Sequence, residues 1–405
     1  MAVLLALLLS ATAWRIYKDY APASGEFDWS RRGYSDFHNG TYLPTRAFVD
    51  GHSPYSSEVA SDYRMARAAP PFSPIVFLIH IPFALLPLKI ASVAFYVYSA
   101  VLVASLAWCS LKMSRQRFRR FDFLAFTNLL LISRPGHMTL YTGYFTLEIV
   151  LGCIVAIHFA KTRPAISGWG ILLASIKPNF FIPLALLLAF RGNYRAVLWG
   201  SLLCVLGASV GFGWLGYHNG LLEVFESVRS GQESLHVDPT EMPVNTWTRV
   251  DLVGMCAKVL QLNPTGIVYL AAMLLIVSAV GLCLRSIADR ESNSGASGPS
   301  ALIIALTILV CVYHHSYECL LFAVPVLGLL FFGRQTMPEI PSKTRLLVGV
   351  LLSVTAVNYV STLSVRGYFG LEPLGFGWQT VTLINGLCIV SALVLLLASP
   401  KQVNT

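Results

Sequence analysis

This sequence contains few charged residues. Asp, Glu, Lys and Arg together make up 12% of its 405 residues, about half of the share found in soluble proteins. A disordered chain is excluded, because such a chain combines much charge with few apolar residues. Hydrophobic residues instead make up 55% of this chain, and its mean hydropathy is +0.64. We therefore predict an all-α, multi-pass transmembrane protein.

Paired cysteines and repeats are missing as well. None of the eight cysteines forms a C-x-x-C pair, so the sequence indicates neither a zinc site nor a disulfide framework. We expect free thiols and no metal or other cofactor; a divalent metal is possible, but no residue pattern indicates one. Because no repeat of fixed period and no soluble domain is evident, residues 1–405 are expected to form a single integral membrane domain.

The net charge of +9 is distributed in a way that indicates membrane topology rather than binding to nucleic acid. Fifteen of the 29 basic residues lie in short turns between apolar runs, as the positive-inside rule expects of cytoplasmic turns. Thirteen of the 20 acidic residues lie within residues 15–71 and 216–262. We place these two long loops on the extracytoplasmic side of a cell membrane.

The apolar runs predict about 11–13 spans, since a bilayer needs roughly 20 apolar residues per helix and fewer where a helix is buried in protein. The predicted spans are 1–20, 72–88, 90–111, 122–141, 144–160, 165–176, 179–190, 195–215, 263–285, 299–315, 317–333, 344–362 and 376–398.

The first three runs conflict with this topology. If 1–20, 72–88 and 90–111 all cross, the basic turn at 112–120 falls on the outside. Either 72–88 or 90–111 is then re-entrant or interfacial, or the first crossing is not a simple span. Residues 1–13 also resemble the apolar part of a signal peptide, although they lack its basic start. Their cleavage is left open, as is the orientation of these runs.

An acid in the first loop is the first candidate for chemistry. Asp36 is followed closely by His38 and precedes the stretch 37–48, which could form an interfacial helix. A carboxylate at the rim of a bilayer can act as a general base, because partial desolvation raises its affinity for protons. The alternative is that Asp36 is an ordinary solvated loop acid.

Polar residues inside apolar runs carry more information, because burying them in hydrocarbon is costly. Lys177 precedes Pro178 in one such run and could bind an anionic headgroup, or it could be a loop lysine. His314 and His315 interrupt a later run. As adjacent residues they point apart on a helix, so phosphate or a sugar hydroxyl is favoured over a metal. Glu148 is either a functional intramembrane acid or a satisfied structural one.

The second long loop offers Asn245, Trp247 and Arg249 within five residues. An arginine can hold phosphate through two hydrogen bonds, and a tryptophan can stack on a sugar or lipid face. The alternative for Trp247 is an anchor at the membrane interface.

Taken in order, these features resemble the GT-C class of membrane glycosyltransferases, and within it glycosyltransferase family 87 (GT87), a family of mannosyl- and arabinofuranosyl-type transferases that use polyprenyl-phosphate sugars. The matching features, which cover roughly residues 30–390, are Asp36, Gly51 to Tyr55, Pro70-Pro71-Phe72, Gly143, Lys177-Pro178, Asn245 and His314-His315. Two positions depart from the family pattern. Tyr144 stands where glutamine is usual after Gly143, and residues 245–247 read Asn-Thr-Trp where Asn-Gln-Ser is usual.

The resemblance implies a GT-C-like fold and an inverting transfer at the outer membrane face. The donor would be a polyprenyl-phosphate-linked sugar, mannose-like or another hexose or pentose, and the acceptor a glycan or glycolipid, with membrane lipids as surroundings. Asp36 would be the catalytic base. The donor phosphate and sugar would be bound by Lys177, His314, His315, Arg249 and Asn245, with His38, Tyr55, Glu148 and Trp247 as further candidates.

Two other classes stay open. A secondary transporter or lipid flippase would also have many spans and intramembrane charges, although transporters often contain inverted repeats and paired broken helices. A non-catalytic polymer-assembly protein is the third class.

Overall fold

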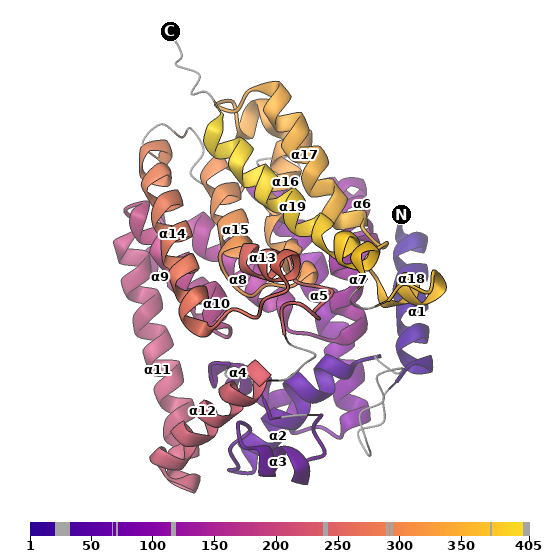
Figure 1. Cartoon of the computed structure of the whole chain (residues 1–405), viewed down its shortest axis with the longest axis vertical. Coiled ribbons are helices and arrows are strands. Elements are labelled where there is room, and N and C mark those ends of the chain that lie inside the picture. Colours follow the sequence, from indigo (N-terminus) through magenta and orange to yellow (C-terminus); the bar gives the residue numbers. More distant parts are fainter. Residues whose placement is uncertain are drawn as a thin grey trace.

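The computed structural model is all-helical. It describes residues 1–20, 33–66, 68–69, 72–114, 119–237, 242–288, 291, 295–372 and 375–399. Within these residues there are nineteen α-helices and two short helices of other types, and no β-strand. The predicted all-α, multi-pass class is confirmed (Figure 1).

Four described helices are long and apolar enough to cross a membrane alone. They are α5 (Leu88–Met113), α11 (Tyr194–Asn219), α14 (Gly266–Ala288) and α19 (Phe376–Ala398). The other apolar helices are shorter, and among them are α4 (Ile75–Ala84), α8 (Thr146–Phe159), α9 (Pro164–Ala174), α10 (Pro178–Phe190) and α15 (Pro299–Cys311). The number of crossings therefore stays a prediction.

Two predicted spans differ from the helices observed. Residues 122–141 form two helices, α6 (Arg120–Ile132) and α7 (Arg134–Thr142). The break falls at Ser133, whose side chain accepts a hydrogen bond from the Gly136 N–H and so caps α7. Residues 317–333 begin with a 3-10 turn, η2 (Ser316–Phe322), and continue as α16 (Ala323–Thr336).

The first three runs form helices of different length. α1 (Ala2–Lys18) and α5 are long, whereas the shorter α4 lies near the lower end of the molecule (Figure 1). With 10 residues, α4 is only about 15 Å long, half the thickness of a bilayer core. This length suits a re-entrant or interfacial segment, which is one of the alternatives for the run 72–88, and the orientation of the first three runs stays a prediction.

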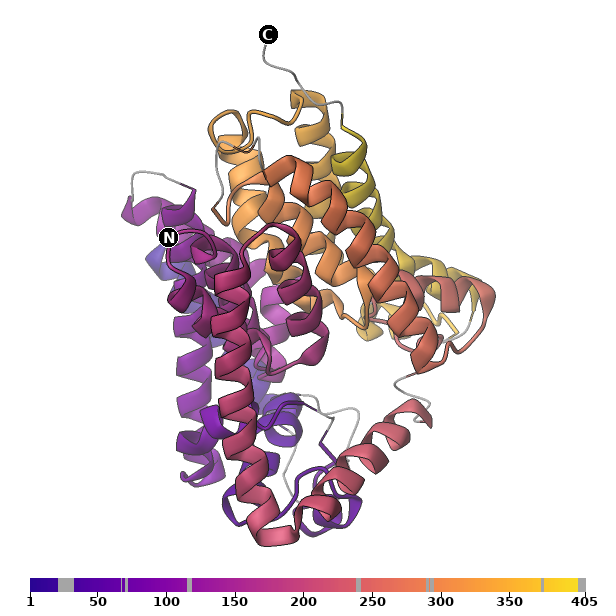
Figure 2. The same cartoon turned by 90° about the vertical axis from the view of Figure 1, so that its left-hand side faces the viewer.

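Both long loops contain helices. In the first loop, residues 37–48 are helical, forming the π-helix η1 (Phe37–Tyr42) and α2 (Leu43–Val49), followed by α3 (Ser57–Asp62). The second loop contains α12 (Leu221–Val237) and α13 (Leu252–Leu260). Figure 2 shows α12 slanting back from the end of α11 toward the C-terminal half. That half ends with α17 (Ser342–Val357), α18 (Leu363–Tyr368) and α19.

The core forms around helices that are apolar on every side. All thirteen residues of α15 are buried, as expected for a helix without a polar face. Beside it, α8 packs closely on α9 because both helices present glycine at the contact. A Cβ atom on Gly170 would lie 2.5 Å from the Gly152 carbonyl oxygen and 2.6 Å from the Ala156 nitrogen. Small residues of this kind let membrane helices approach to backbone contact.

We expect Gly170→Ala to force α8 and α9 apart and to lower the free energy of unfolding by about 1–3 kcal/mol, the usual cost of overpacking. The measurement is thermal or chemical unfolding of the purified protein in detergent. Gly213→Ala in α11 is the matched control, since nothing lies within 4 Å of a Cβ at that position. Equal stability of the two variants would contradict the close contact.

Candidate functional site

A buried ion pair joins two distant parts of the chain. Lys177 lies in the turn between α9 and α10, and its Nζ is 2.6 Å from Oε1 of Glu318 in η2. The two side chains are 5% and 0% exposed. Lys177 has the extended backbone conformation that a residue before proline favours, and Pro178 occupies the first turn of α10. The Lys-Pro sequence thus ends one helix, starts the next and turns the ammonium inward.

Glu318 collects further donors. Nδ1 of His314 lies 2.7 Å from its Oε2, and the backbone N–H of His315 donates to the same oxygen at 2.9 Å. One carboxylate therefore holds both Lys177 and the double-histidine segment. A buried carboxylate such as that of Glu318 is tolerated only when its oxygen atoms accept hydrogen bonds, as they do here.

The two adjacent histidines face different surroundings, as expected from their sequence positions. His314 is fully buried, with its ring edge-on to Phe180 and its Nε2 without a hydrogen-bond partner. His315 is half-buried. Its Nδ1 lies 2.6 Å from the Thr248 hydroxyl, and its Nε2 lies 2.9 Å from the Tyr313 hydroxyl.

Aromatic rings connect this cluster to the first loop. Nζ of Lys177 lies 4.4 Å from the centre of the Tyr144 ring, which packs edge-on against Tyr317. Tyr317 in turn interacts electrostatically with Asp36. Gly40 of η1 faces the same Tyr144 ring, which would lie 3.5 Å from a Cβ atom there. Asp36 itself is half-buried at the N-terminal end of η1. The structure thus brings Asp36, Lys177 and His315 into one neighbourhood.

The second loop packs against the double-histidine segment. The Val250 N–H donates to the His314 carbonyl at 3.0 Å, and the Ser316 N–H donates to the Thr248 carbonyl at 2.7 Å. Between these bonds, Arg249 makes two 2.7 Å bonds to the Asp251 carboxylate. Arg249 is 2% exposed, so its charge is already neutralised inside the protein.

Other predicted residues of this loop are more open. Asn245 is exposed, and Trp247 is half-buried. The guanidinium of Arg134, at the start of α7, lies 5.6 Å from the centre of the Trp247 ring. Arg134 is buried and anchored to the Asn358 and Ser361 carbonyls after α17.

Three other candidates lie outside this neighbourhood. Tyr55 is buried and donates to the Phe72 carbonyl at 2.6 Å. His38 is buried, with its ring edge-on to Tyr20. Glu148 pairs with Nε2 of His80 at 3.0 Å, inside the bundle. Pro70 and Pro71 lie outside the described residues.

Gly143, just before Tyr144, occupies a position that only glycine suits. It ends α7 in the left-handed conformation, with φ of 73°, and a Cβ atom on it would lie 2.7 Å from the Phe37 Cβ. Glycine suits this position because it adopts the left-handed conformation without strain and has no Cβ atom.

Metal binding finds no support in the described part of the chain. No group of three or more His, Cys, Asp or Glu side chains there could hold a metal ion. All eight cysteines are free thiols.

Sequence reasoning missed several of these residues. Asp251 was counted only as a loop acid, and Tyr317 carries no signal of its own. Lys258, by contrast, could have been found from the sequence, because it is a lysine inside the apolar stretch 252–260. It lies buried in α13, with its Nζ 3.0 Å from the Thr382 hydroxyl.

Breaking the Lys177–Glu318 pair is expected to be costly from either side. Lys177→Met and Glu318→Gln should each lower the free energy of unfolding by about 3–5 kcal/mol, because each leaves a buried partner unpaired. The double variant should lose less than the sum of the two, as measured by unfolding in detergent. The exposed pair Arg229–Glu233, at 3.0 Å, is the control, with an expected coupling of about 0.3–0.5 kcal/mol. Additive losses at 177 and 318 would contradict the ion pair.

Lys258 should make stability depend on pH. Burial, together with the nearby Arg249, lowers the pKa of Lys258 to about 7, whereas an unfolded chain keeps this proton to about pH 10. Between these values the unfolded state binds more protons, so the free energy of unfolding rises with pH. We expect Lys258→Met to be more stable than wild type below pH 7, with the difference shrinking toward pH 9. A difference that does not change with pH would rule out this assignment.

Comparison with known protein families identifies the family of the chain. The model of glycosyltransferase family 87 matches residues 70–312, more than half of the chain. No curated protein and no solved structure matches it. The matched residues include Lys177 and Arg249, while Asp36 lies 34 residues before them and His314 two residues after them. The chain belongs to glycosyltransferase family 87 and is a membrane glycosyltransferase.

Proposed function

We propose that this protein transfers a sugar, mannose-like or another hexose or pentose, from a polyprenyl-phosphate donor to a hydroxyl of a lipid- or glycan-linked acceptor, with inversion at the anomeric carbon. One observation carries the proposal. The first-loop acid Asp36 interacts electrostatically with Tyr317, whose ring packs on Tyr144, and the Tyr144 ring lies 4.4 Å from the buried ammonium of Lys177. A base and a cation close together are what such a displacement needs.

Asp36 is the base in this mechanism. Its carboxylate removes the proton of the acceptor hydroxyl as that oxygen forms a bond to the anomeric carbon. The bond from the anomeric carbon to the phosphate oxygen breaks on the opposite face. A single displacement of this kind inverts the configuration.

The leaving group is the polyprenyl phosphate, which takes the bonding electron pair and gains a negative charge. Lys177 has three N–H donors, of which Glu318 accepts one. The remaining N–H donors of this ammonium stabilise the charge that develops on phosphate, whereas both ring nitrogens of His315 are already bonded, to Thr248 and to Tyr313. Arg249 orients the second loop through Asp251 instead of touching the donor, since both of its bonds and its burial are internal.

The side of the membrane follows from charge. Described residues of the basic turns after α5, α8, α10 and α16 lie toward one end of the molecule, and α2, α3 and α12 of the two long loops lie at the other (Figures 1 and 2). The positive-inside rule places the turns in the cytoplasm. The site then belongs to the extracytoplasmic side of the cell membrane, next to the two long loops.

Asp36→Asn is expected to lower transfer by about 10²–10⁴-fold, the usual contribution of a general base. The measurement is transfer from radiolabelled polyprenyl-phosphate mannose, glucose and arabinofuranose in membranes that contain equal amounts of each protein, with membrane-extracted acceptors. Glu58→Gln, at an exposed acid in the same loop, is the control and should keep its activity.

Two outcomes would contradict the proposal in different ways. Full activity of Asp36→Asn would remove Asp36 as the base while leaving the donor class intact. No transfer by wild type from any of the three donors would overturn the donor class.

A further inference from the structure

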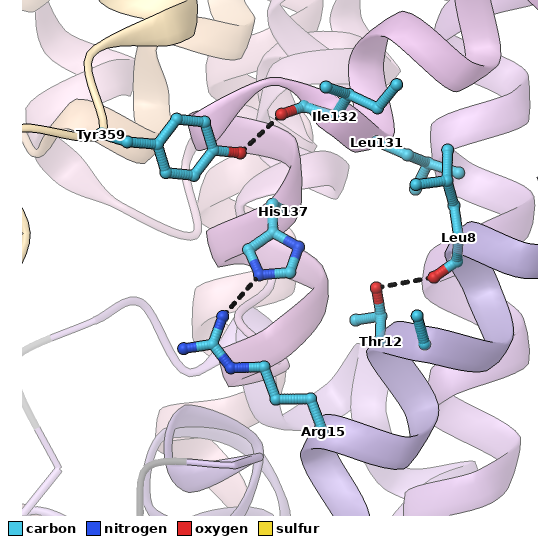
Figure 3. A pocket seen from close by; sticks show the side chains of 8 residues that line it. Leu8, Thr12, Arg15, Leu131, Ile132, His137 and Tyr359 are labelled. Atoms are coloured by element: carbon cyan, nitrogen blue, oxygen red, sulfur yellow. Dashed lines mark hydrogen bonds between the residues drawn. The ribbon is translucent and has the colours of Figure 1, made fainter. Parts of the chain in front are cut away.

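A groove separate from the candidate site lies between α1, α6, α7 and the loop after α17 (Figure 3). Its volume is about 310 Å³. α1 stands at the edge of the molecule (Figure 1), and much of its surface is exposed and apolar, including Leu7 and Trp14. In a membrane this groove therefore opens on lipid.

The walls of the groove suit a hydrocarbon chain. Leu8 and Ala11 come from α1, and Leu131 and Ile132 come from α6. The nearby hydroxyl protons are already used: Thr12 donates to the Leu8 carbonyl at 2.9 Å. Tyr359 donates to the Ile132 carbonyl at 2.5 Å. Both bonds are drawn in Figure 3. An apolar chain along these walls leaves neither proton unpaired.

One end of the groove is polar and rich in donors. Nη1 of Arg15 lies 2.9 Å from Nε2 of His137. A guanidinium can only donate, so Nε2 is the acceptor and the proton of the ring is on Nδ1. The Arg15 guanidinium also lies 4.4 Å from the centre of the Tyr141 ring, which fixes its orientation. The remaining guanidinium N–H groups and the Nδ1–H of His137 together suit an anionic oxygen group.

The charge at this end favours a singly charged anion. Asp19 lies 3.7 Å from Nε of Arg15, and it would repel a phosphate monoester, which carries nearly two charges at pH 7. A phosphodiester carries one. Because α7 packs against both α1 and η2, it separates the groove from the Lys177–Glu318 cluster. A lipid bound here is therefore not positioned for the transfer reaction.

We propose that this groove binds one anionic phospholipid of the bilayer, with an acyl chain along Leu8, Ala11 and Leu131 and the phosphodiester on Arg15 and His137. This lipid would hold α1 against α6 and α7. The direct polar bonds of α1 to the bundle are few, among them the bond from Asn128 Nδ2 to the Met1 carbonyl at 3.2 Å. The proposal does not depend on the identity of the sugar donor.

The test is a lipid-dependent thermal shift of the full-length purified protein in detergent, with phosphatidylglycerol, phosphatidylcholine of the same chains, or farnesyl phosphate added. Phosphatidylglycerol should raise the Tm of wild type most. Its apparent affinity should be about tenfold weaker for Arg15→Gln, which removes charge-assisted hydrogen bonds. Binding should also be lost in Ala11→Phe, which fills the groove without touching its polar end.

Leu7→Phe is the matched control on α1, since Leu7 is 62% exposed and does not line the groove. It should keep the full shift, and native mass spectrometry should show one bound phosphatidylglycerol in wild type and in this control. No shift in wild type, equal shifts in all variants, or equal shifts with phosphatidylcholine would overturn the proposal. A shift with farnesyl phosphate alone, lost in the same two variants, would assign the groove to a prenyl lipid and would also overturn it.

Discussion

The buried ion pair between Lys177 and Glu318 is the interaction on which the candidate site depends. It joins the turn between α9 and α10 to η2, 141 residues further along the chain. Because Glu318 also accepts hydrogen bonds from His314 and from the His315 N–H, one carboxylate fixes three positive or polar groups. A pair of this kind repays its desolvation only when its geometry is fully satisfied. The ion pair therefore positions the residues of the candidate site, and its presence is not evidence that it adds to the stability of the fold.

Local signals predicted the elements next to this pair correctly. Lys177 and Pro178 mark the break between α9 and α10 because proline cannot continue the preceding helix. Residues 37–48, for which an interfacial helix was one interpretation, are helical in the structure. By contrast, the break at Ser133 lay inside a continuous apolar run. It depends on a cap formed by the Ser133 side chain, and nothing in the sequence distinguishes this serine from other serines in apolar runs.

Long-range partners could not be predicted in the same way. The sequence indicates Arg249 as a phosphate ligand, but it does not show that Asp251, two residues later, accepts two hydrogen bonds from its guanidinium. Asp36 and Lys177 were each identified from their own surroundings. Their proximity depends on Tyr144 and Tyr317, which belong to different segments and meet only in the folded protein. Charge in an apolar context is visible in a sequence, but its compensation is a property of the fold.

The π-helical turn that follows Asp36 has a consequence for how this loop can change. A π-helix takes one more residue per turn than an α-helix, so η1 accommodates an additional residue between Asp36 and α2. The direction of the Asp36 carboxylate relative to α2 is therefore set by the number of residues in η1 as much as by their identity. An insertion or deletion within residues 37–42 would rotate Asp36 relative to α2, even if every side chain of the site were retained.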